Sequence, residues 1–371
     1  MTDALRQERK LSQEVLSGFA CMAAMIANGS EQLNFETLWP IANGLQMAPS
    51  EPVRLTSRMR SGTGRKAGNP GFFDRPELFS SFIYNICAIL KAACRALPGK
   101  QEEILMGKRY LIAVDLEGAA CVVGTPFTSL NGSSNYAFAC RQATREADAA
   151  ARALFDGGAE EVIVWDNHGQ GVNLDYEQLD PRCRILLGTG YRSRFPLPEG
   201  RYDGLILIGY HGREGTPGGV LAHSYNSVSF QGHTVNGEPL GEMQIDAAFA
   251  GKRGVPVLFA ASDDQAIAQA RESFPWIETV VTKQASAWNF ALSLHPQAAV
   301  EAIYRGVTAA LAREAEMQVY TIREPLHLSL RFRRADEAAA AQLYDRARRP
   351  FASPDAYTRE GWLDQLEDLF N

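Results

Sequence analysis

The sequence lacks a disulfide framework and any apolar run long enough to cross a membrane. Its six cysteines are scattered over 371 residues and form no Cys-x-x-Cys pair, which excludes a secreted disulfide scaffold and favours reduced, buried thiols. The most apolar stretches are residues 16–26 and 79–97, and polar side chains interrupt the second one. A membrane span needs about 20 uninterrupted apolar residues, so the second stretch is predicted to be an amphipathic helix.

The sequence also lacks an excess of positive charge. Its 43 acidic residues outnumber 37 basic ones, giving a net charge of -6, which disfavours a general binder of nucleic acids or anionic membranes. Within residues 1–14, acidic side chains cancel the basic ones, so the positively charged start of a signal peptide is missing. We therefore expect a cytoplasmic protein that binds neither nucleic acid nor membrane.

The composition that remains is that of a folded protein with an unusual N-terminal part. Hydrophobic residues make up 46% and charged residues 22%, as in globular chains of roughly two domains. Residues 48–76 are rich in Pro, Gly, Ser and basic side chains and predict a linker, whereas 77–97 predict a helix. We expect an extension over residues 1–105, helical and partly disordered. It is either a real appended segment or an over-extended gene start, since Met106 is an adequate start.

From Lys108 onward, apolar strands alternate with helices. Strands are expected at residues 108–118, 161–169, 204–212, 255–262 and 279–283, and helices at 136–156, 241–251, from 264, and at 297–315. This alternation predicts an α/β fold with a three-layer αβα core and a mainly parallel sheet. We expect a domain over residues 106–371, with an α/β part at 106–262 and a smaller α+β part at 263–371. The latter would hold a strand at 326–333 and a charged helical tail.

Chemically informative side chains follow three successive strands. Asp115 and Glu117 lie two apart at the end of the first strand, so both carboxylates turn to the same side. His168 follows the second strand and His211 the third. Ligands bind outside the carboxyl ends of parallel strands, so these four side chains are expected to meet at one edge of the sheet.

Such a set of oxygen and nitrogen donors suits zinc. Burying two adjacent carboxylates without a cation would cost several kcal/mol. One ion would bind three or four of the side chains, whereas two ions sharing a bridging carboxylate would use them all. Taken singly, each residue has a simpler explanation, because carboxylates cap helices and most loop histidines are merely hydrogen-bonded.

Two more candidates lie downstream of the glycine-rich segment at residues 209–219. His223 lies in the sequence VLAHSYNS, and Glu242 opens the helix expected at 241–251. Glu242 could simply complement the helix dipole, and His223 could be a loop residue without a role. The glycine-rich segment lacks GxxxxGK[ST], so a phosphate-binding loop is disfavoured.

The order of short motifs resembles the zinc-dependent D-aminopeptidase family. The motifs are VDLEG (114–118), WDNH (165–168), GYH (209–211), GGVLAHS (218–224), GE (241–242), SDD (262–264) and TKQ (282–284). The resemblance implies two zinc ions per subunit, with Asp115 as the bridge and His223 as the catalytic histidine. The zinc ligands it implies are Asp115, Glu117, His168, His211 and Glu242. It also implies a decameric ring assembly that admits only short peptides.

Together, these observations predict a metal-dependent aminopeptidase that hydrolyses short peptides, with a D-amino acid expected at the N-terminus. Zinc would activate a water molecule, and His223 would serve as general base and acid. Weaker candidates for contacts to substrate or its oxyanion are Ser224, Asn226, Asp263, Asp264 and Lys283. The alternatives are another binuclear-metal amidase or phosphoesterase, or a non-catalytic dipeptide-binding protein of a transport system.

Overall fold

The structure is a computed structural model that describes residues 107–190, 194–195 and 200–370. The described residues belong to a unit that begins at Gly107. The expectations for residues 1–105, including the linker at 48–76 and the helix at 77–97, lie outside the described residues. Among the described residues, none of the helices combines the length and apolar composition that a membrane crossing requires.

The centre of the fold is a seven-stranded sheet with the order β3-β2-β1-β4-β7-β8-β9. Its strands are β1 (Lys108–Val114), β2 (Ala159–Asp166), β3 (Arg184–Leu186), β4 (Gly204–Ile208), β7 (Val257–Asp263), β8 (Glu278–Ala287) and β9 (Phe290–Ser293). Every neighbouring pair is parallel except β8 and β9, which are antiparallel. The expected, mainly parallel sheet is therefore confirmed.

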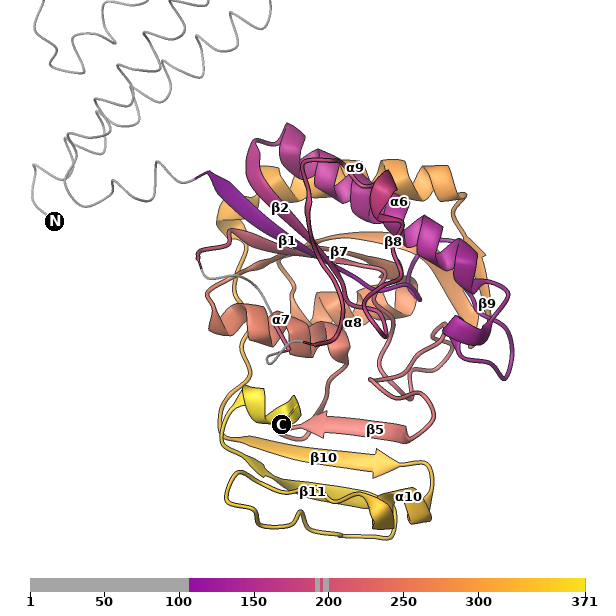
Figure 1. Ribbon diagram of the computed structural model, residues 1–371, viewed down its shortest axis with the longest axis vertical. Coiled ribbons are helices and arrows are strands. Elements are labelled where there is room, and N and C mark those ends of the chain that lie inside the picture. The colour runs from indigo at the N-terminus through magenta and orange to yellow at the C-terminus, as the bar shows by residue number, and fades with distance from the viewer. Residues whose placement is uncertain (1–106, 191–193, 196–199, 371) are drawn as a thin grey trace, which may run out of the picture. The chain divides into compact units, whose positions relative to one another are not determined.

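Helices cover both faces of this sheet, as Figure 1 shows. One face carries α6 (Tyr136–Asp156) and α9 (Pro296–Ala312), and the other carries α7 (Glu242–Lys252) and α8 (Asp264–Ser273). Alternate residues of β1 enter different cores: Ile112 packs in the core with α6 and α9, whereas Leu111 packs in the core with α7 and α8. Because both faces are covered, the strand is apolar and buried from Tyr110 to Val114, after the two basic residues at its start.

The strand order reverses next to β1. From β1 the chain passes outward to β2 and β3, and then returns to β4 on the other side before continuing to β7 and β8. The connections after β1 and β4 thus leave in different directions, through α6 on one face and α7 on the other. Such a reversal opens space at the carboxyl ends of the two central strands, where Asp115 and His211 are found.

A second, antiparallel sheet has the order β11-β10-β5-β6. Its strands are β5 (Phe230–Val235), β6 (Glu238–Pro239), β10 (Leu326–Phe332) and β11 (Thr358–Leu363). Residues of β5, β10 and β11 share one core with α7 and α8, and this sheet lies beyond α7 and α8 in Figure 1. β10 alternates buried and less buried positions, as expected for a sheet with one covered face.

Two expectations about the C-terminal part were wrong. The division near residue 262 does not separate the two sheets, because β8, β9 and α9 belong to the first sheet layer and β5 and β6 belong to the second sheet. In place of a charged helical tail, the chain forms the short helix α10 (Ala335–Ala340), β11 and a 3-10 turn at Leu366–Phe370. Pairing with β10 stabilises β11, and such long-range pairing leaves little local sequence signal.

Candidate metal centre

Asp115 and Glu117 directly follow β1, beside the end of β4. The backbone N–H of Asp115 donates to the carbonyl of Ile208 over 2.8 Å, and that of Gly118 donates to Gly209 over 2.6 Å. Gly209 has φ +73°, and a Cβ atom there would lie 2.1 Å from the Asp115 carbonyl oxygen. Because the two strand ends approach so closely, the side chains of Asp115 and Glu117 are buried, with 4% and 3% of their surface exposed.

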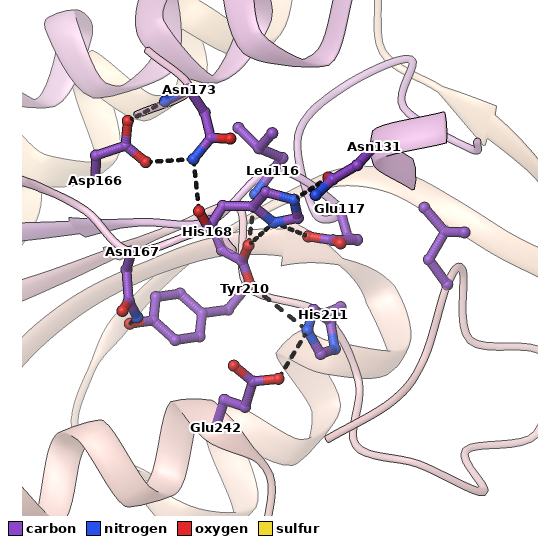
Figure 2. Close-up of polar contacts among 12 residues, drawn as sticks. Leu116, Glu117, Asn131, Asp166, Asn167, His168, Asn173, Tyr210, His211 and Glu242 are labelled. Carbon is purple, nitrogen blue, oxygen red and sulfur yellow. Dashed lines mark hydrogen bonds and ion pairs between the residues drawn. The ribbon is translucent and has the colours of Figure 1, made fainter. Parts of the chain in front are cut away.

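His168 joins this pair from the connection after β2. Its Nδ1 atom lies 2.7 Å from Asp115 Oδ1 and 3.2 Å from Glu117 Oε2. Its other ring nitrogen, Nε2, donates to Asn131 Oδ1 over 2.6 Å, as Figure 2 shows. Since Nε2 carries this proton, the nitrogen that faces the two carboxylates needs a second proton or a cation.

His211 and Glu242 complete the opposite side of the cluster. His211 follows β4 and donates from Nδ1 to the Gly212 carbonyl over 3.0 Å. Its Nε2 atom lies 3.5 Å from Asp115 Oδ2 and 3.4 Å from Glu242 Oε1. Glu242 is the first residue of α7, and its Oε1 atom accepts the backbone N–H of Tyr225 over 2.8 Å. The two oxygens of Asp115 therefore face two different histidines.

His223 lies against His211. The two rings stack with centroids 3.9 Å apart and planes 12° apart. His223 donates from Nδ1 to the Leu221 carbonyl over 2.7 Å, and its Nε2 atom lies 4.0 Å from Glu242 Oε1. All three histidines thus use one ring nitrogen on an oxygen acceptor and turn the other toward carboxylates.

The protonation equilibria reflect this concentration of charge. Burial and the Glu117 carboxylate raise the pKa of Asp115 to about 7. Burial opposes charge on His168 and His211, yet neighbouring carboxylates raise the pKa of His168 to about 11 and that of His211 to about 10. Burial likewise opposes ionisation of Glu242, but His211 lowers its pKa to about 2. The cluster strongly favours positive charge at its centre, either as protons or as a metal cation.

His223 differs from the other two histidines. Burial and the neighbouring His211 lower the pKa of His223. Its imidazole is therefore neutral near pH 7, and the lone pair of Nε2 is available to accept a proton.

The donor set fits a zinc centre. Two groups of residues have one ligand atom each within 4.8 Å of the others: Asp115, Glu117 and His211, and His211, His223 and Glu242. Ligands bound to one zinc ion at about 2.0–2.2 Å and tetrahedral angles lie about 3.4 Å apart. The spacings of 3.4 Å and 3.5 Å around His211 Nε2 match this value. In addition, the buried Glu117 Oε2 atom has no hydrogen-bond partner among the described residues apart from the facing His168 Nδ1 atom at 3.2 Å.

A network of polar side chains around Asp246, none of them a candidate ligand, orients the segments that carry the candidate ligands. Asp246, one turn after Glu242 on α7, accepts hydrogen bonds from Asn167 Nδ2 over 2.9 Å and Tyr210 OH over 2.7 Å. The Arg194 guanidinium also donates to both Asp246 oxygens. Asn167 precedes His168, and Tyr210 precedes His211, as Figure 2 shows. Asp246 therefore connects three segments that carry candidate ligands, and such partners fix ligand orientation.

The residues expected to contact substrate have varied surroundings. Ser224 is buried, and its hydroxyl has no hydrogen-bond partner among the described residues. Asn226 is exposed and uses its side-chain oxygen to accept two backbone N–H groups of the following turn. Asp263 caps α8, and Asp264 accepts the backbone N–H of Ala285. Lys283 is buried with its ammonium on backbone carbonyls. Asp263, Asp264 and Lys283 thus all bind protein groups.

Sequence reasoning missed several residues of the site. Asn131 lies in the short 3-10 turn Leu130–Gly132, and no periodic pattern or motif distinguishes it. Asp246 carried a usable signal, because a carboxylate four positions after Glu242 interrupts an otherwise apolar face of α7. Arg194 and Tyr210 gave no comparable signal.

The fold and the cluster together define a class of protein. An imidazole and carboxylate cluster at the carboxyl edge of a parallel sheet is the arrangement of a metal-dependent hydrolase. Comparison with known families is more specific. The family model for D-aminopeptidases, peptidase family M55, matches residues 109–365, so the chain belongs to this family. It is a peptidase, and the expected resemblance is confirmed.

Individual relatives agree with this assignment. A D-aminopeptidase of Bacillus subtilis (strain 168) is 31% identical over 238 residues, which cover 63% of this chain and 85% of the relative. A solved structure, described as the Zn-dependent D-aminopeptidase DppA from Bacillus subtilis, a self-compartmentalizing protease, is similar with a TM-score of 0.62. It is 27% identical, and the match covers 70% of this chain and 93% of that chain.

Proposed function

We propose that this chain is a zinc-dependent aminopeptidase that removes an N-terminal D-amino acid from short peptides, with two zinc ions per chain. The ligands would be Asp115, Glu117, His168, His211 and Glu242. Asp115 is the proposed bridge because its Oδ1 atom faces His168 and its Oδ2 atom faces His211. Family membership supports peptide hydrolysis over phosphoester hydrolysis or peptide transport.

One observation carries the proposal of a metal centre. His168 and His211 each donate one N–H to a protein oxygen and turn the second nitrogen toward buried carboxylates. In a buried site without water, the lone pair of an imidazole nitrogen and a carboxylate repel each other unless a positive charge lies between them. When bound, zinc supplies that charge, lowers the pKa of a water molecule and polarises the substrate carbonyl.

The chain itself supplies the proton transfers in this proposal. His223 Nε2 accepts the proton of the attacking water and then donates it to the leaving amine, a role worth about 10²–10⁴ in rate. The hydrogen bond from Nδ1 to Leu221 holds the ring in the required tautomer. Neutral His223 is the form that this role needs at pH 7, in keeping with the lowered pKa.

Contacts to the substrate are proposed for Ser224 and Asn226. The Ser224 hydroxyl is the better candidate to donate to the developing oxyanion, because it is buried without a partner among the described residues. The Asn226 side chain offers its NH₂ group, since its oxygen is already used within a turn. Asp263, Asp264 and Lys283 support the surrounding backbone instead.

Assembly into a homo-oligomer, with a decamer as the form implied by the family, is also proposed. The similar solved structure is described as self-compartmentalizing. In this chain, β9 pairs with β8 on one side only within the described sheet. The segment from Trp288 to Leu294 contains no charged residue and exposes 67% of Phe290 and 71% of Leu292. Monomeric proteins usually protect such an edge strand with charged side chains. We therefore propose that a second copy of the chain packs against the exposed edge of β9. A cytoplasmic location stays a prediction of the sequence.

The experiment that tests the function combines metal analysis with substrate assays on the full chain. We expect two zinc ions per chain by elemental analysis, with loss of hydrolysis of D-alanyl dipeptides on chelation and recovery on addition of zinc. Fewer than one zinc per chain together with insensitivity to chelators would contradict the metal centre and favour a peptide-binding protein. Faster turnover of L-amino-acid amides or p-nitrophenyl phosphate would favour the amidase or phosphoesterase alternative.

A further inference from the structure

A buried lysine close to the candidate metal centre has no part in the proposed chemistry. Lys283 lies on β8 opposite Asp263 of β7, and only 1% of its surface is exposed. Burying an ammonium group is costly unless hydrogen bonds and nearby negative charge compensate for the lost water. A lysine retained in such a place therefore requires specific partners.

The partners of Lys283 are backbone carbonyl groups of a single turn. Its Nζ atom donates to the carbonyl oxygens of Glu117, Ala119 and Val122, over 2.8 Å in the latter two contacts. An ammonium group has three N–H donors, so each donor has one acceptor. All three acceptors belong to the turn that follows Asp115, and one of them belongs to the candidate ligand Glu117.

Other buried side chains hold the same turn. Thr282, the neighbour of Lys283, donates from Oγ1 to the Gly118 carbonyl over 2.6 Å. Glu146 of α6 accepts the backbone N–H of Ala120 over 2.9 Å. The turn from Leu116 to Val122 belongs to no helix or strand. These contacts from β8 and α6 therefore add to its few backbone hydrogen bonds in fixing its conformation.

We propose that Lys283 is a positioning residue that clamps the turn after β1 and thereby holds Asp115 and Glu117 in the geometry for metal binding. The inference rests on the proposed metal centre and extends it to a residue that contacts neither substrate nor metal. The positive charge of Lys283 also offsets part of the charge of the surrounding carboxylates, which include Asp263 and Glu146. Loss of the ammonium removes a donor from all three carbonyl groups, and only that of Ala119 keeps another, the backbone N–H of Val122, so the turn is expected to rearrange.

The test measures the zinc affinity of the folded Lys283→Met variant by competition with a chromophoric chelator. Methionine keeps most of the length of the side chain but has neither donors nor charge. Disturbing a group that orients a ligand typically weakens metal binding about 10- to 100-fold, and a loss in this range is expected. Lys252→Met is the matched control, because Lys252 is paired with Glu324 and Glu367 at the surface. It should bind zinc as the unchanged chain does.

A second control separates positioning from general stability. Ile303→Ala removes a buried side chain of α9 and should lower the free energy of unfolding by about 2–5 kcal/mol, with zinc affinity unchanged. If folded Lys283→Met binds zinc as tightly as the unchanged chain, the inference is overturned. If the unchanged chain itself binds no zinc, the proposed metal centre fails instead, so the two failures are distinguishable.

Two further variants cover the case in which Lys283→Met does not fold. Lys283→Gln keeps an NH₂ group that can serve some of the carbonyls, and a smaller loss of zinc affinity is expected. Thr282→Val removes only the contact to Gly118 and should weaken zinc binding several-fold. Zinc affinity equal to that of the unchanged chain in folded Thr282→Val contradicts a clamp formed by β8.

Discussion

His211 and His223 stack face to face 3.9 Å apart, yet their electrostatic surroundings are opposite. Nε2 of His211 lies between the carboxylates of Asp115 and Glu242, which favour positive charge there. His223 is farther from Glu242, and burial together with His211 lowers its pKa. Two adjacent rings of the same type are thus suited to different tasks, one to bind a metal ion and the other to accept a proton.

Substitution of each ring should separate these tasks. His211→Ala is expected to lose zinc and activity together, because it removes a donor shared by both groups of candidate ligands. His223→Ala should keep zinc and lower kcat about 10²–10⁴-fold. Zinc content and kcat are measured on the same preparations, with His327→Ala in β10 as the control. Loss of zinc in His223→Ala would make this residue a ligand, and unchanged kcat would remove it from the mechanism.

Asn131 should set the tautomer of His168. Asn131→Leu removes the acceptor for Nε2–H, so the ring loses its fixed orientation and zinc affinity is expected to fall about 10-fold or more. Asn131→Asp keeps an oxygen acceptor at the same place and should retain zinc. The measurement is chelator competition on both variants. Equal zinc affinities for the two variants would show that this hydrogen bond does not orient the ligand.

Gly118→Ala should be poorly tolerated. A Cβ atom at this position would lie 2.2 Å from the Tyr210 carbonyl oxygen and 2.5 Å from Ser262 Oγ, so the turn after β1 has to move. We expect a loss of about 3 kcal/mol in the free energy of unfolding, measured by urea denaturation, and weaker zinc binding. Gly190→Ala is the matched control, since a Cβ atom there has no neighbour within 4 Å. Similar stabilities for the two variants would contradict the close approach of the strand ends.

Assembly should depend on β9. Replacing Phe290 and Leu292 by Asp places charge on the exposed apolar edge, which should disrupt contact between copies. Light scattering after size-exclusion chromatography is expected to give a smaller mass for the double variant than for the unchanged chain. Val319→Asp, which changes another exposed apolar residue, should leave the mass unchanged. An unaltered mass for the β9 variant would mean that copies associate through another surface.

The parallel sheet and the approximate position of the site were predictable from the sequence because both depend on local patterns. Apolar runs such as Tyr110–Val114 and Leu205–Ile208 are buried on both faces and so stand out from their surroundings. Polar residues directly after such runs must lie at the carboxyl edge of a parallel sheet. This rule was sufficient to select Asp115, His168 and His211 for one site.

Other features depend on contacts between distant parts of the chain. The sequence itself determined which segments form the central strands, because strands buried on both faces are continuous apolar runs. It also determined which donors follow these strands, because the donors come directly after each run. Only the tertiary structure decided that Asn131 orients His168, that β11 joins β10, and that Lys283 faces backbone carbonyls. A hydrogen bond or strand pair between residues far apart in the chain depends on the tertiary fold. The sequence around either partner contains no local pattern that predicts it.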